Sequence, residues 1–422
     1  MRRLYSLAWW LALPVVLARL WWRGRKEPGY REHIGERLAL IPQRSDSAPL
    51  IWLHAVSVGE TRAAAPLIDL LLARYPSHDL LLTHMTATGR ATGAALFAQY
   101  GKRLRQAYLP YDIGCIVERF LVRNAPQICL LMETEIWPNL MARCAARQIP
   151  VVLVNARLSE RSLKKAQQLG GLMRDAARQL RCVGAQTPND AERIRSLGVD
   201  NVAVTGSIKF DVMPSAASLV LGQQLRQQIG GRPVLLYAST REGEEAMILD
   251  ALASSNLPPT TLLILVPRHP QRFDAVTALV TSRGLSLQRR SILGEANIDA
   301  DVLLGDSMGE MFSYCVASDI VAIGGSLLPL GGQNPIEACA VGKPVLFGPH
   351  TFNFSAVSED AIAAGAALRV ADVAALLRDA GALLRDDALR LAMGTSALRF
   401  AQQHRGAAVR TMALLQPHLA VG

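Results

Sequence analysis

Motifs of several common enzyme classes are missing from this sequence of 422 residues. It has no Walker A motif, no G-x-G-x-x-G after its first predicted strand, no G-x-S-x-G and no H-E-x-x-H. Their absence argues against four classes of enzyme: P-loop nucleotidases, dinucleotide-binding enzymes with the standard fingerprint, α/β-hydrolases and zinc proteases of the H-E-x-x-H type. Charged residues are also scarce at 19%, whereas 50% of the residues are hydrophobic, which favours a folded chain with sizeable cores.

Cysteine is sparse and unpatterned. The sequence has no C-x-x-C pair, and its six cysteines lie far apart, at Cys115, Cys129, Cys144, Cys182, Cys315 and Cys339. This spacing indicates a reducing compartment and no structural zinc, so we interpret each cysteine as a small core residue. A D-x-D motif, which metal-dependent sugar transferases use, occurs at Asp299-Ala300-Asp301. Because it lies in a polar loop before a predicted strand, we interpret it as incidental.

The net charge of +10 suggests nucleic-acid binding, but the excess is local. Residues 1–45 contain nine Lys or Arg residues and three Glu residues, a net charge of +6, which leaves +4 for the remaining chain. No interleaving of aromatic and basic residues, as in RNA-binding modules, follows this region. We therefore expect no nucleic-acid partner.

The positive charge flanks an apolar segment from Leu4 to Trp22, which Pro14 and Arg19 interrupt. Its length is close to the ~20 residues that cross a hydrocarbon core, and it holds four tryptophans, which favour the headgroup region. No small-residue cleavage site follows, which argues against a secretory signal peptide. We expect this segment to bind a membrane, with the basic residues after it on the cytoplasmic side. A helix buried against the domain is the alternative, and spanning and lying flat both stay open.

From Pro49 onward, short apolar runs alternate with helical patterns such as 61–74 and 160–180, which is typical of parallel α/β units. The predicted strands are 50–56, 80–83, 128–132, 151–154 and 202–205 in the first half, and 234–238, 261–266, 302–304, 320–323 and 344–347 in the second. We predict an α/β chain with two doubly wound Rossmann-like domains. The predicted boundaries are an anchor at 1–28, a first domain at 29–208, a linker at 209–231 and a second domain with closing helices at 232–422.

Four predicted helix starts directly follow strands. Three have the S-x-x-E form of a capping box, at Ser57–Glu60, Ser239–Glu242 and Ser307–Glu310, and the fourth, Asn334–Glu337, has an Asn cap followed by Pro335. Open α/β sheets bind ligands at the carboxyl ends of their strands, and helix N-termini favour phosphate. Glycines at positions 324, 325, 331 and 332 surround the last of these starts. We expect an anionic, nucleotide-like ligand in a cleft between the domains; the alternative is that the boxes only start helices.

The segment Pro267-Arg268-His269-Pro270 follows a predicted strand and places a guanidinium and an imidazole at the same edge. The planar fork of an arginine bonds two phosphate oxygens at once. We interpret Arg268 as a phosphate ligand, with a solvated loop as the alternative.

Several longer segments resemble those of the lipid A Kdo transferase family, where Kdo is 3-deoxy-D-manno-octulosonic acid. They are HAVSVGET at 54–61, METEIWPN at 132–139, NARLS at 155–159, GSIKFD at 206–211, VPRHP at 266–270, GDSMGE at 305–310 and GPHTFNF at 348–354. The resemblance covers nearly the whole chain, including the Trp-rich segment and the Arg-Gly-Arg-Lys after it. One position departs from it, because Gln333 stands where the family usually has His.

The resemblance implies a glycosyltransferase-B fold and transfer of Kdo from CMP-Kdo to a lipid A precursor (lipid IVA), with inversion, in lipopolysaccharide synthesis at the inner membrane. It assigns acceptor binding to the first domain and the CMP-sugar to the second. It implies that Glu60 is the general base and that Glu133 and Lys209 support the transition state. The implied CMP ligands are Pro267, Arg268, Met308, Gly309, Glu310, Asn334, Pro335, Ile336 and Glu337. The glutamine at position 333 puts an acid or base role of this position in doubt, but its side chain is still able to form hydrogen bonds.

These assignments carry three expectations. The helix N-terminus next to Glu60 favours its ionised form, which makes it an available but weak base. A capping-box Glu folds back on its own helix, so our hypothesis is that Glu60 instead points outward to reach the acceptor hydroxyl. We expect no metal or other cofactor, because helix N-termini, Arg268 and Lys209 can neutralise the single phosphate of CMP.

Two alternatives remain at this point. One is another enzyme of the same fold, either a transferase that adds N-acetylglucosamine to a lipid carrier or a nucleotide-sugar epimerase, although an epimerase has no need of a membrane segment. The other is a peripheral protein without enzymatic activity that binds anionic lipid through its basic start and has no affinity for CMP.

Overall fold

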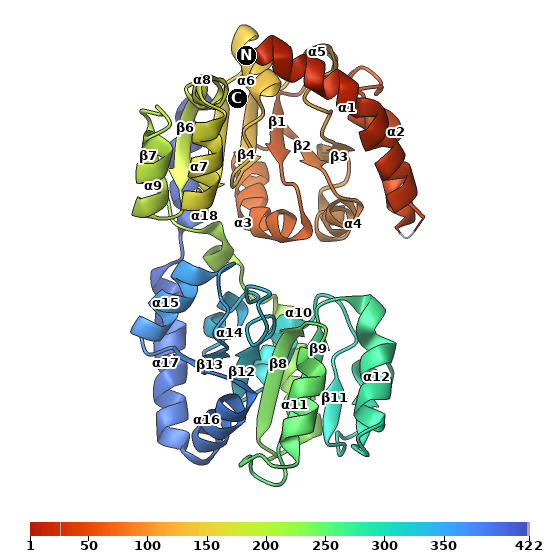
Figure 1. The fold of residues 1–422 in the computed structure, drawn as a ribbon, viewed down its shortest axis with the longest axis vertical. Coiled ribbons are helices and arrows are strands. Elements are labelled where there is room, and N and C mark those ends of the chain that lie inside the picture. Colours follow the sequence, from red (N-terminus) through yellow and green to blue (C-terminus); the bar gives the residue numbers. More distant parts are fainter. Residues whose placement is uncertain (26, 420–422) are drawn as a thin grey trace. The chain divides into compact units, whose positions relative to one another are not determined.

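The computed structural model describes residues 1–25 and 27–419, which form two compact units (Figure 1). The first unit comprises Met1–Val212 together with the described residues from Arg405 onward, and the second comprises Met213–His404. Each unit is built on a parallel β-sheet with helices on its faces, so the predicted α/β class with two doubly wound domains is confirmed.

The described part of the first unit contains a sheet of seven parallel strands in the order β3-β2-β1-β4-β5-β6-β7. The strands are β1 (Leu50–His54), β2 (Asp79–His84), β3 (Leu104–Tyr108), β4 (Ile128–Met132), β5 (Val151–Ala156), β6 (Leu180–Ala185) and β7 (Val202–Val204). The helices are α1 (Arg2–Arg23), α2 (Ile34–Arg37), α3 (Val58–Arg74), α4 (Ala87–Leu96), α5 (Gly114–Asn124), α6 (Pro138–Ala146), α7 (Glu160–Gln168), α8 (Gly171–Ala177), α9 (Pro188–Arg195) and α18 (Ala407–Leu415). Short 3-10 turns are η1 (Pro28–Tyr30), η2 (Ala98–Arg103), η3 (Ile208–Asp211) and η6 (Gln416–His418).

Strand β1 shows why the sheet is covered on both faces. All five of its side chains are buried, and they alternate between two cores. Leu50 and Trp52 pack into one core, while Ile51 and Leu53 pack into the other with residues of α3 and α18. A central parallel strand buried on both faces reads as an unbroken apolar run, which is the pattern that the sequence shows.

Residues 213–404 form a second sheet of seven parallel strands in the order β10-β11-β9-β8-β12-β13-β14. The strands are β8 (Val234–Thr240), β9 (Leu262–Pro267), β10 (Leu287–Arg289), β11 (Val302–Leu304), β12 (Ile320–Ile323), β13 (Val345–Phe347) and β14 (Ala367–Arg369). The helices are α10 (Ala216–Ile229), α11 (Glu244–Leu252), α12 (Phe273–Thr281), α13 (Met311–Ala317), α14 (Ile336–Ala340), α15 (Ser355–Ala363), α16 (Val373–Arg385) and α17 (Asp387–Gln403), with turns η4 (Pro270–Arg272) and η5 (Arg290–Ile292).

All ten predicted strands are present, but β3, β6, β10 and β14 were not predicted. Strands β10 and β14 are three-residue edge strands whose burial is incomplete, so they lack an apolar run. Strand β6 begins at Leu180, where the predicted helix 160–180 ends; that helix is in fact two, α7 and α8. Five cysteines are buried as predicted, whereas Cys115 is exposed on α5.

The boundary between the units differs from the predicted one in two ways. Residues 209–231 are not a linker, because η3 belongs to the first unit and α10 is a helix of the second that packs on α13. The segment from Arg405 onward returns to the first unit. There the carboxylate of Asp211 accepts hydrogen bonds from the backbone N–H groups of Gly406 and Ala408, both at 2.5 Å, and so caps the start of α18.

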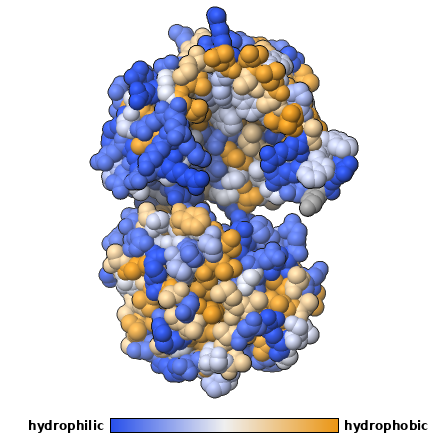
Figure 2. All heavy atoms as spheres, in the orientation of Figure 1, coloured by the Kyte–Doolittle hydropathy of each residue, from blue (hydrophilic) through white to orange (hydrophobic). Residues whose placement is uncertain are grey.

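Helix α1 lies against the first unit by one of its faces. Leu13 is buried, Trp9 packs on Tyr111 with ring centroids 5.8 Å apart, and the Ser6 hydroxyl donates to Asn139 at 3.2 Å. The other face is apolar and exposed, as at Leu4 (71% exposed) and Leu11 (72%). Figure 2 shows hydrophobic side chains gathered along the course that α1 follows in Figure 1. By length and composition α1 is able to cross a membrane, which indicates membrane association.

Candidate active site

Glu60 lies in the first turn of α3, directly after β1. Ser57 caps this helix, since the backbone N–H of Glu60 donates to the Ser57 hydroxyl at 3.5 Å. The Glu60 carboxylate folds back over the cap: its Oε2 accepts from the backbone N–H of Val56 at 2.8 Å, and its Oε1 accepts from the Ser57 hydroxyl at 3.2 Å. The Ser57 half of the predicted capping box is therefore confirmed, while the Glu60 carboxylate bonds the N–H of Val56 rather than that of Ser57. The hypothesis that Glu60 points outward is wrong, because these two donors hold its carboxylate.

The electrostatics of Glu60 also differ from the prediction. Burial raises the pKa of the Glu60 carboxyl to about 7; the bond from Val56 acts against this rise, and the neighbouring Glu133 and Glu135 add to it. The prediction that the helix N-terminus keeps this group a weak base is therefore wrong, because desolvation outweighs the helix and its hydrogen bonds. A carboxyl with this pKa exchanges a proton readily near neutral pH.

Glu133 and Lys209 form an ion pair in the first unit. Glu133 follows β4, the neighbour of β1 in the sheet, and Lys209 lies in η3. Lys209 Nζ is 2.8 Å from Glu133 Oε1, and the two side chains are only 23% and 21% exposed. Because Glu133 also adds to the pKa of Glu60, all three predicted catalytic residues interact at one edge of the sheet.

Two residues beside this ion pair have unusual backbone angles. Glu133 has a φ of 59°, and Asn155, near the end of β5, has a φ of 53°. Asn155 is fully buried, and its Oδ1 accepts from the backbone N–H of Ile208 at 3.0 Å, so it holds the turn that carries Lys209. Positive φ at residues other than glycine costs conformational energy and is concentrated at functional sites.

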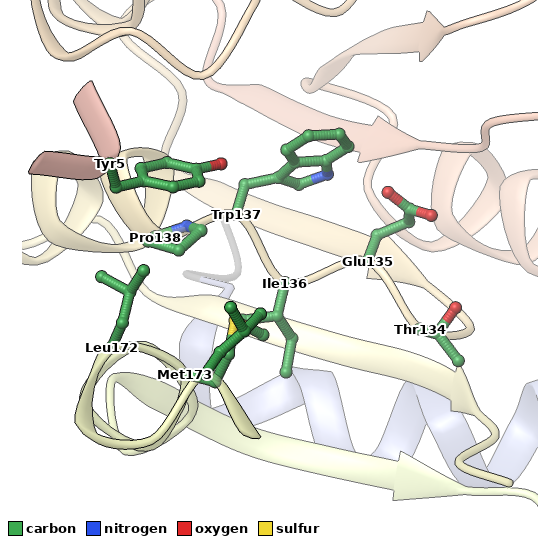
Figure 3. Close-up of a pocket in the computed structure, with 9 residues that line it drawn as sticks. Tyr5, Thr134, Glu135, Ile136, Trp137, Pro138, Leu172 and Met173 are labelled. Atoms are coloured by element: carbon green, nitrogen blue, oxygen red, sulfur yellow. The ribbon is translucent and has the colours of Figure 1, made fainter. Parts of the chain in front are cut away.

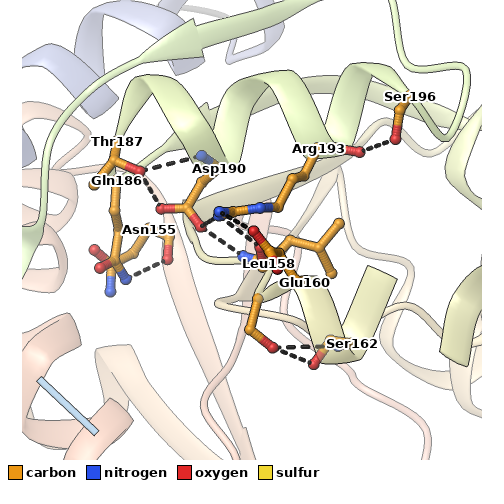
Figure 4. A network of polar contacts seen from close by, with 10 residues as sticks. Asn155, Leu158, Glu160, Ser162, Gln186, Thr187, Asp190, Arg193 and Ser196 are labelled. Carbon is orange, nitrogen blue, oxygen red and sulfur yellow. Dashed lines mark hydrogen bonds and ion pairs between the residues drawn. The ribbon is translucent and has the colours of Figure 1, made fainter. Parts of the chain in front are cut away.

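A network of polar contacts fixes the loop that follows Asn155 (Figure 4). Gln186 donates to the backbone carbonyl of Asn155 at 2.9 Å. The buried carboxylate of Asp190 accepts from the backbone N–H of Leu158 at 2.9 Å and from the hydroxyl of Thr187 at 2.6 Å. These bonds join the loop after β5 to the start of α9. They hold Asn155 in place, and Asn155 in turn holds the turn that carries Lys209.

Glu135 is a site residue that the sequence reasoning missed. Burial raises the pKa of its carboxyl, the neighbouring Trp137 side chain opposes the rise, and the charge of Glu133 adds to it. The two glutamates of the Glu-Thr-Glu segment after β4 would lie on the same face if the strand continued. The strand ends at Met132, so the sequence alone does not show that the two carboxylates lie close to each other.

In the second unit, basic side chains gather after β8 and β9. Pro267 is the buried last residue of β9, and the backbone N–H of Arg268 donates to the carbonyl of Thr240 at 3.0 Å, which ties the two strand ends together. Burial lowers the pKa of the His269 imidazole, and the cationic Arg241, Arg268 and Arg272 lower it further. The mutual influence of these groups shows a concentrated positive charge that suits an anion. Arg241 was not predicted as part of it.

A buried carboxylate orders the backbone beneath this basic cluster. Glu244 is fully buried and accepts backbone N–H bonds from Arg241 at 3.0 Å, Gly325 at 2.6 Å and Leu327 at 3.1 Å. Gly324 leaves no room for a side chain, because a Cβ there would meet the backbone of Ser239. The glycines after β12 therefore allow its loop to approach the loop after β8.

The other predicted helix starts differ from the sequence interpretation. Helix α11 begins at Glu244 rather than after Ser239, which stays in β8 with a φ of 59°. Helix α13 begins at Met311, so Ser307 is no cap; its hydroxyl instead donates to the Glu310 carboxylate at 2.7 Å. Both predicted capping boxes are wrong, because the residues between the Ser and the Glu of each S-x-x-E segment are not helical. Gly243 and Gly309, with φ of 95° and 86°, break these turns.

The segment from Asn334 to Glu337 keeps part of its predicted form. Asn334 Oδ1 accepts from the backbone N–H of Ile336 at 3.1 Å, but Pro335 is the cap and α14 has only five residues. Met308 is 54% exposed after β11, and the Glu310 carboxylate lies 3.1 Å from Arg290 Nε. Of the nine predicted nucleotide residues, Pro267 ends β9 and the other eight follow strands β9, β11 or β12 of the second sheet.

The D-x-D motif takes part in local structure. Asp301 accepts hydrogen bonds from the backbone N–H of Ser286 at 2.9 Å and from its hydroxyl at 2.6 Å. Among residues 1–25 and 27–419, no three His, Cys, Asp or Glu side chains are grouped as metal ligands.

The two doubly wound sheets, one with half-buried carboxylates and the other with a basic cluster at its strand ends, form a glycosyltransferase-B fold. Residues 32–212 match the family described as "3-Deoxy-D-manno-octulosonic-acid transferase (kdotransferase)". The chain is 46% identical to a 3-deoxy-D-manno-octulosonic acid transferase from Bordetella pertussis and 35% identical to one from Haemophilus influenzae, over 99% of each chain in both comparisons. The chain belongs to the Kdo transferase family.

Solved structures of lower similarity support the fold alone. The UDP-GlcNAc 2-epimerase of Neisseria meningitidis has a TM-score of 0.59 at 18% identity and covers 87% of this chain and 100% of its own. A glycosyltransferase from Rickettsia africae has a TM-score of 0.58 at 11% identity and covers 88% of this chain and 98% of its own.

Proposed function

We propose that the chain transfers Kdo from CMP-Kdo to a hydroxyl of a lipid A precursor, with inversion at the anomeric carbon. The observation that carries this proposal is the Glu60 carboxyl, whose pKa burial raises to about 7, beside the Glu133–Lys209 ion pair in a member of the Kdo transferase family. The raised pKa of this half-buried carboxyl supports a proton-transfer role, and the family supports the identity of the sugar.

Glu60 acts as the general base in this proposal. The acceptor hydroxyl gives its proton to the Glu60 carboxylate while its oxygen attacks the anomeric carbon. The bond from that carbon to the phosphate oxygen breaks, and CMP leaves as an anion. A base is most effective when its pKa lies near the working pH, which the value of about 7 satisfies. The bonds from Val56 and Ser57 leave lone pairs on both oxygens and fix the direction in which they point.

Lys209 and Glu133 act as a pair. Lys209 supplies a positive charge for the negative charge that develops on the leaving phosphate or stands on the Kdo carboxylate. Glu133 holds the ammonium group at 2.8 Å, and Asn155 holds the turn behind it. A prepositioned charge stabilises the transition state without reorganisation during the reaction.

The CMP moiety binds at the basic cluster of the second unit. Arg268 is the proposed phosphate ligand, and Arg241 adds a second guanidinium that the family resemblance did not assign. The residues after β11 and β12, from Met308 to Glu310 and from Asn334 to Glu337, complete the nucleotide site. Because these cations are sufficient for one phosphate, we propose that transfer needs no metal, so activity should survive excess chelator.

The membrane part of the proposal rests on α1. Its exposed apolar face and the basic residues that follow it support binding to the inner membrane, with both units on the cytoplasmic side. This location gives the enzyme access to a lipid-linked acceptor.

The test is direct. Purified full-length protein is incubated with CMP-Kdo and lipid IVA, the product mass is measured, and the anomeric configuration is determined by NMR. The proposal predicts a mass gain of one or more Kdo units with inverted configuration. Hydrolysis of CMP-Kdo without a glycosylated lipid, or retention of configuration, would contradict it.

A further inference from the structure

A pocket in the first unit has no role in the mechanism described so far. It has a volume of about 370 Å³ and is formed by the start of α1, the loop between β4 and α6, and the region of α7 and α8. Figure 3 shows Tyr5 and Leu172 toward one end and Glu135 at the other, with Trp137, Ile136 and Met173 between them. Apart from Glu135, the lining is apolar or aromatic with one threonine.

We propose that this pocket binds a fatty acyl chain of the lipid-linked acceptor. The inference rests on the proposed function, because it names how the lipid part of that acceptor is recognised. An apolar lining with a single carboxyl group at one end does not suit a nucleotide or a sugar, whose polar groups need hydrogen-bonding partners. An alkyl chain needs none.

The first argument for this occupant is continuity with the membrane-binding face. Tyr5 belongs to α1, and its neighbours Leu4 and Leu7 are 71% and 56% exposed. The helix that contacts lipid in the proposed function therefore also supplies a wall of the pocket.

The second argument is the position of the other end. Glu135 lies two residues after Glu133, whose carboxylate holds Lys209, and its charge acts on the pKa of Glu60. A lipid acceptor has an apolar chain and a reactive hydroxyl in one molecule. With the chain in the pocket, its polar head lies on the side of Glu135, toward the proposed base. The pocket thus adds the binding energy of the acyl chain to the affinity for an acceptor whose head lies on the side of the base.

The pocket also explains the packing of α1 against the first unit. The hydroxyl of Ser6 bonds Asn139, and Tyr5 interacts with the buried carboxylate of Asp112. These contacts place the Tyr5 ring where it forms a wall. A helix that served only as a membrane anchor needs no such attachment.

The test compares two acceptors in full-length protein. Leu172→Trp fills the pocket, and Leu96→Trp is the control, since Leu96 is exposed on α4 of the same unit and does not line the pocket. Kinetics are measured with lipid IVA and with its fully deacylated disaccharide. Each methylene shielded from water strengthens binding about fourfold, so losing two raises the KM for lipid IVA about fifteenfold. We expect kcat, CMP affinity and the KM for the deacylated acceptor to stay unchanged.

A second measurement locates the chain directly. A lipid IVA analogue with a diazirine on one acyl chain is photolysed with the protein, and labelled peptides are identified by mass spectrometry. The proposal predicts labelling of residues 134–138 and 169–173, and its loss in Leu172→Trp.

Three outcomes overturn the proposal. They are an equal effect of Leu172→Trp on both acceptors, no effect on either, and labelling of the pocket by a diazirine phospholipid that lipid IVA fails to displace. The native protein distinguishes failure of this proposal from failure of the proposed function. If it glycosylates the deacylated acceptor while Leu172→Trp behaves like Leu96→Trp, the proposed function is retained and the acyl site is rejected.

Discussion

The two sheets of this protein share an architecture but present opposite charges at the carboxyl ends of their strands. In the first unit, the strand ends carry three carboxylates, Glu60, Glu133 and Glu135, and one ammonium group. In the second, Arg241 and Arg268 stand beside His269, whose imidazole pKa they lower. The fold does not determine this chemistry, because both edges are built from the same strand-to-helix turns.

The difference explains how one architecture is used for two tasks. Desolvation, with a contribution from two neighbouring carboxylates, raises the pKa of Glu60 into the neutral range, which suits proton abstraction. A cluster of guanidinium groups attracts a phosphate and holds it. Removing charge at the carboxylate edge should therefore impair the chemical step, whereas removing charge at the basic edge should impair CMP binding.

The largest effect is expected at Lys209, the ion-pair partner of Glu133. Lys209→Met leaves Glu133 without its ion pair and removes the charge that stabilises the transition state, so kcat should fall about 10³-fold with little change in CMP affinity. Steady-state kinetics with lipid IVA measure this. Lys102→Met, at an exposed position of the same unit, is the control. A fall in kcat of less than about tenfold would show that the ammonium is not needed.

A smaller effect, on a different parameter, is expected at the basic edge. Arg268→Gln and Arg241→Gln should each weaken CMP binding about tenfold to a hundredfold, because a charge-assisted hydrogen bond contributes about 1.5–3 kcal/mol. Isothermal titration with CMP checks this, with Arg378→Gln on the exposed side of α16 as the control. If Arg268→Gln lowered kcat but left CMP affinity intact, the proposed division of tasks would be wrong.

The smallest effect is a shift in the pH profile. Glu135→Gln removes a negative charge that raises the pKa of Glu60, so that pKa should fall, by less than about one unit. The acid limb of kcat/KM then moves to lower pH, and the variant is relatively more active than the native protein below pH 7. Glu118→Gln, whose carboxylate pairs with Arg147 at the surface, should leave the limb in place. A shift of the limb to higher pH would contradict the carboxylate cluster.

The sequence predicted most of the framework of both sheets, because central parallel strands are buried on both faces and leave unbroken apolar runs. It failed where burial is partial, as in β10 and β14, and where a contact joins distant segments. The return of α18 to the first unit depends on Asp211, which bonds residues almost two hundred positions away. No local pattern records such a contact.

Prediction at the site was limited in the same way. The residues Glu60, Glu133 and Lys209 were found through family motifs, and the structure brings them together. The direction of the pKa shift at Glu60 was missed, because the helix start is visible in the sequence whereas the burial that outweighs it is not. Likewise, the glycines that end the turns before α11 and α13 prevent two of the three capping boxes from forming.

The central claim is that Glu60 removes the proton from the acceptor. Its most direct test is the pH dependence of kcat/KM for the native protein and for Glu60→Gln, measured with CMP-Kdo and lipid IVA. The native protein should gain activity as the pH rises through about 7, where the Glu60 carboxyl ionises. Glu60→Gln should retain CMP binding, lose about 10³-fold in rate and show no such limb. Near-native turnover by Glu60→Gln, with the limb preserved, would contradict the account.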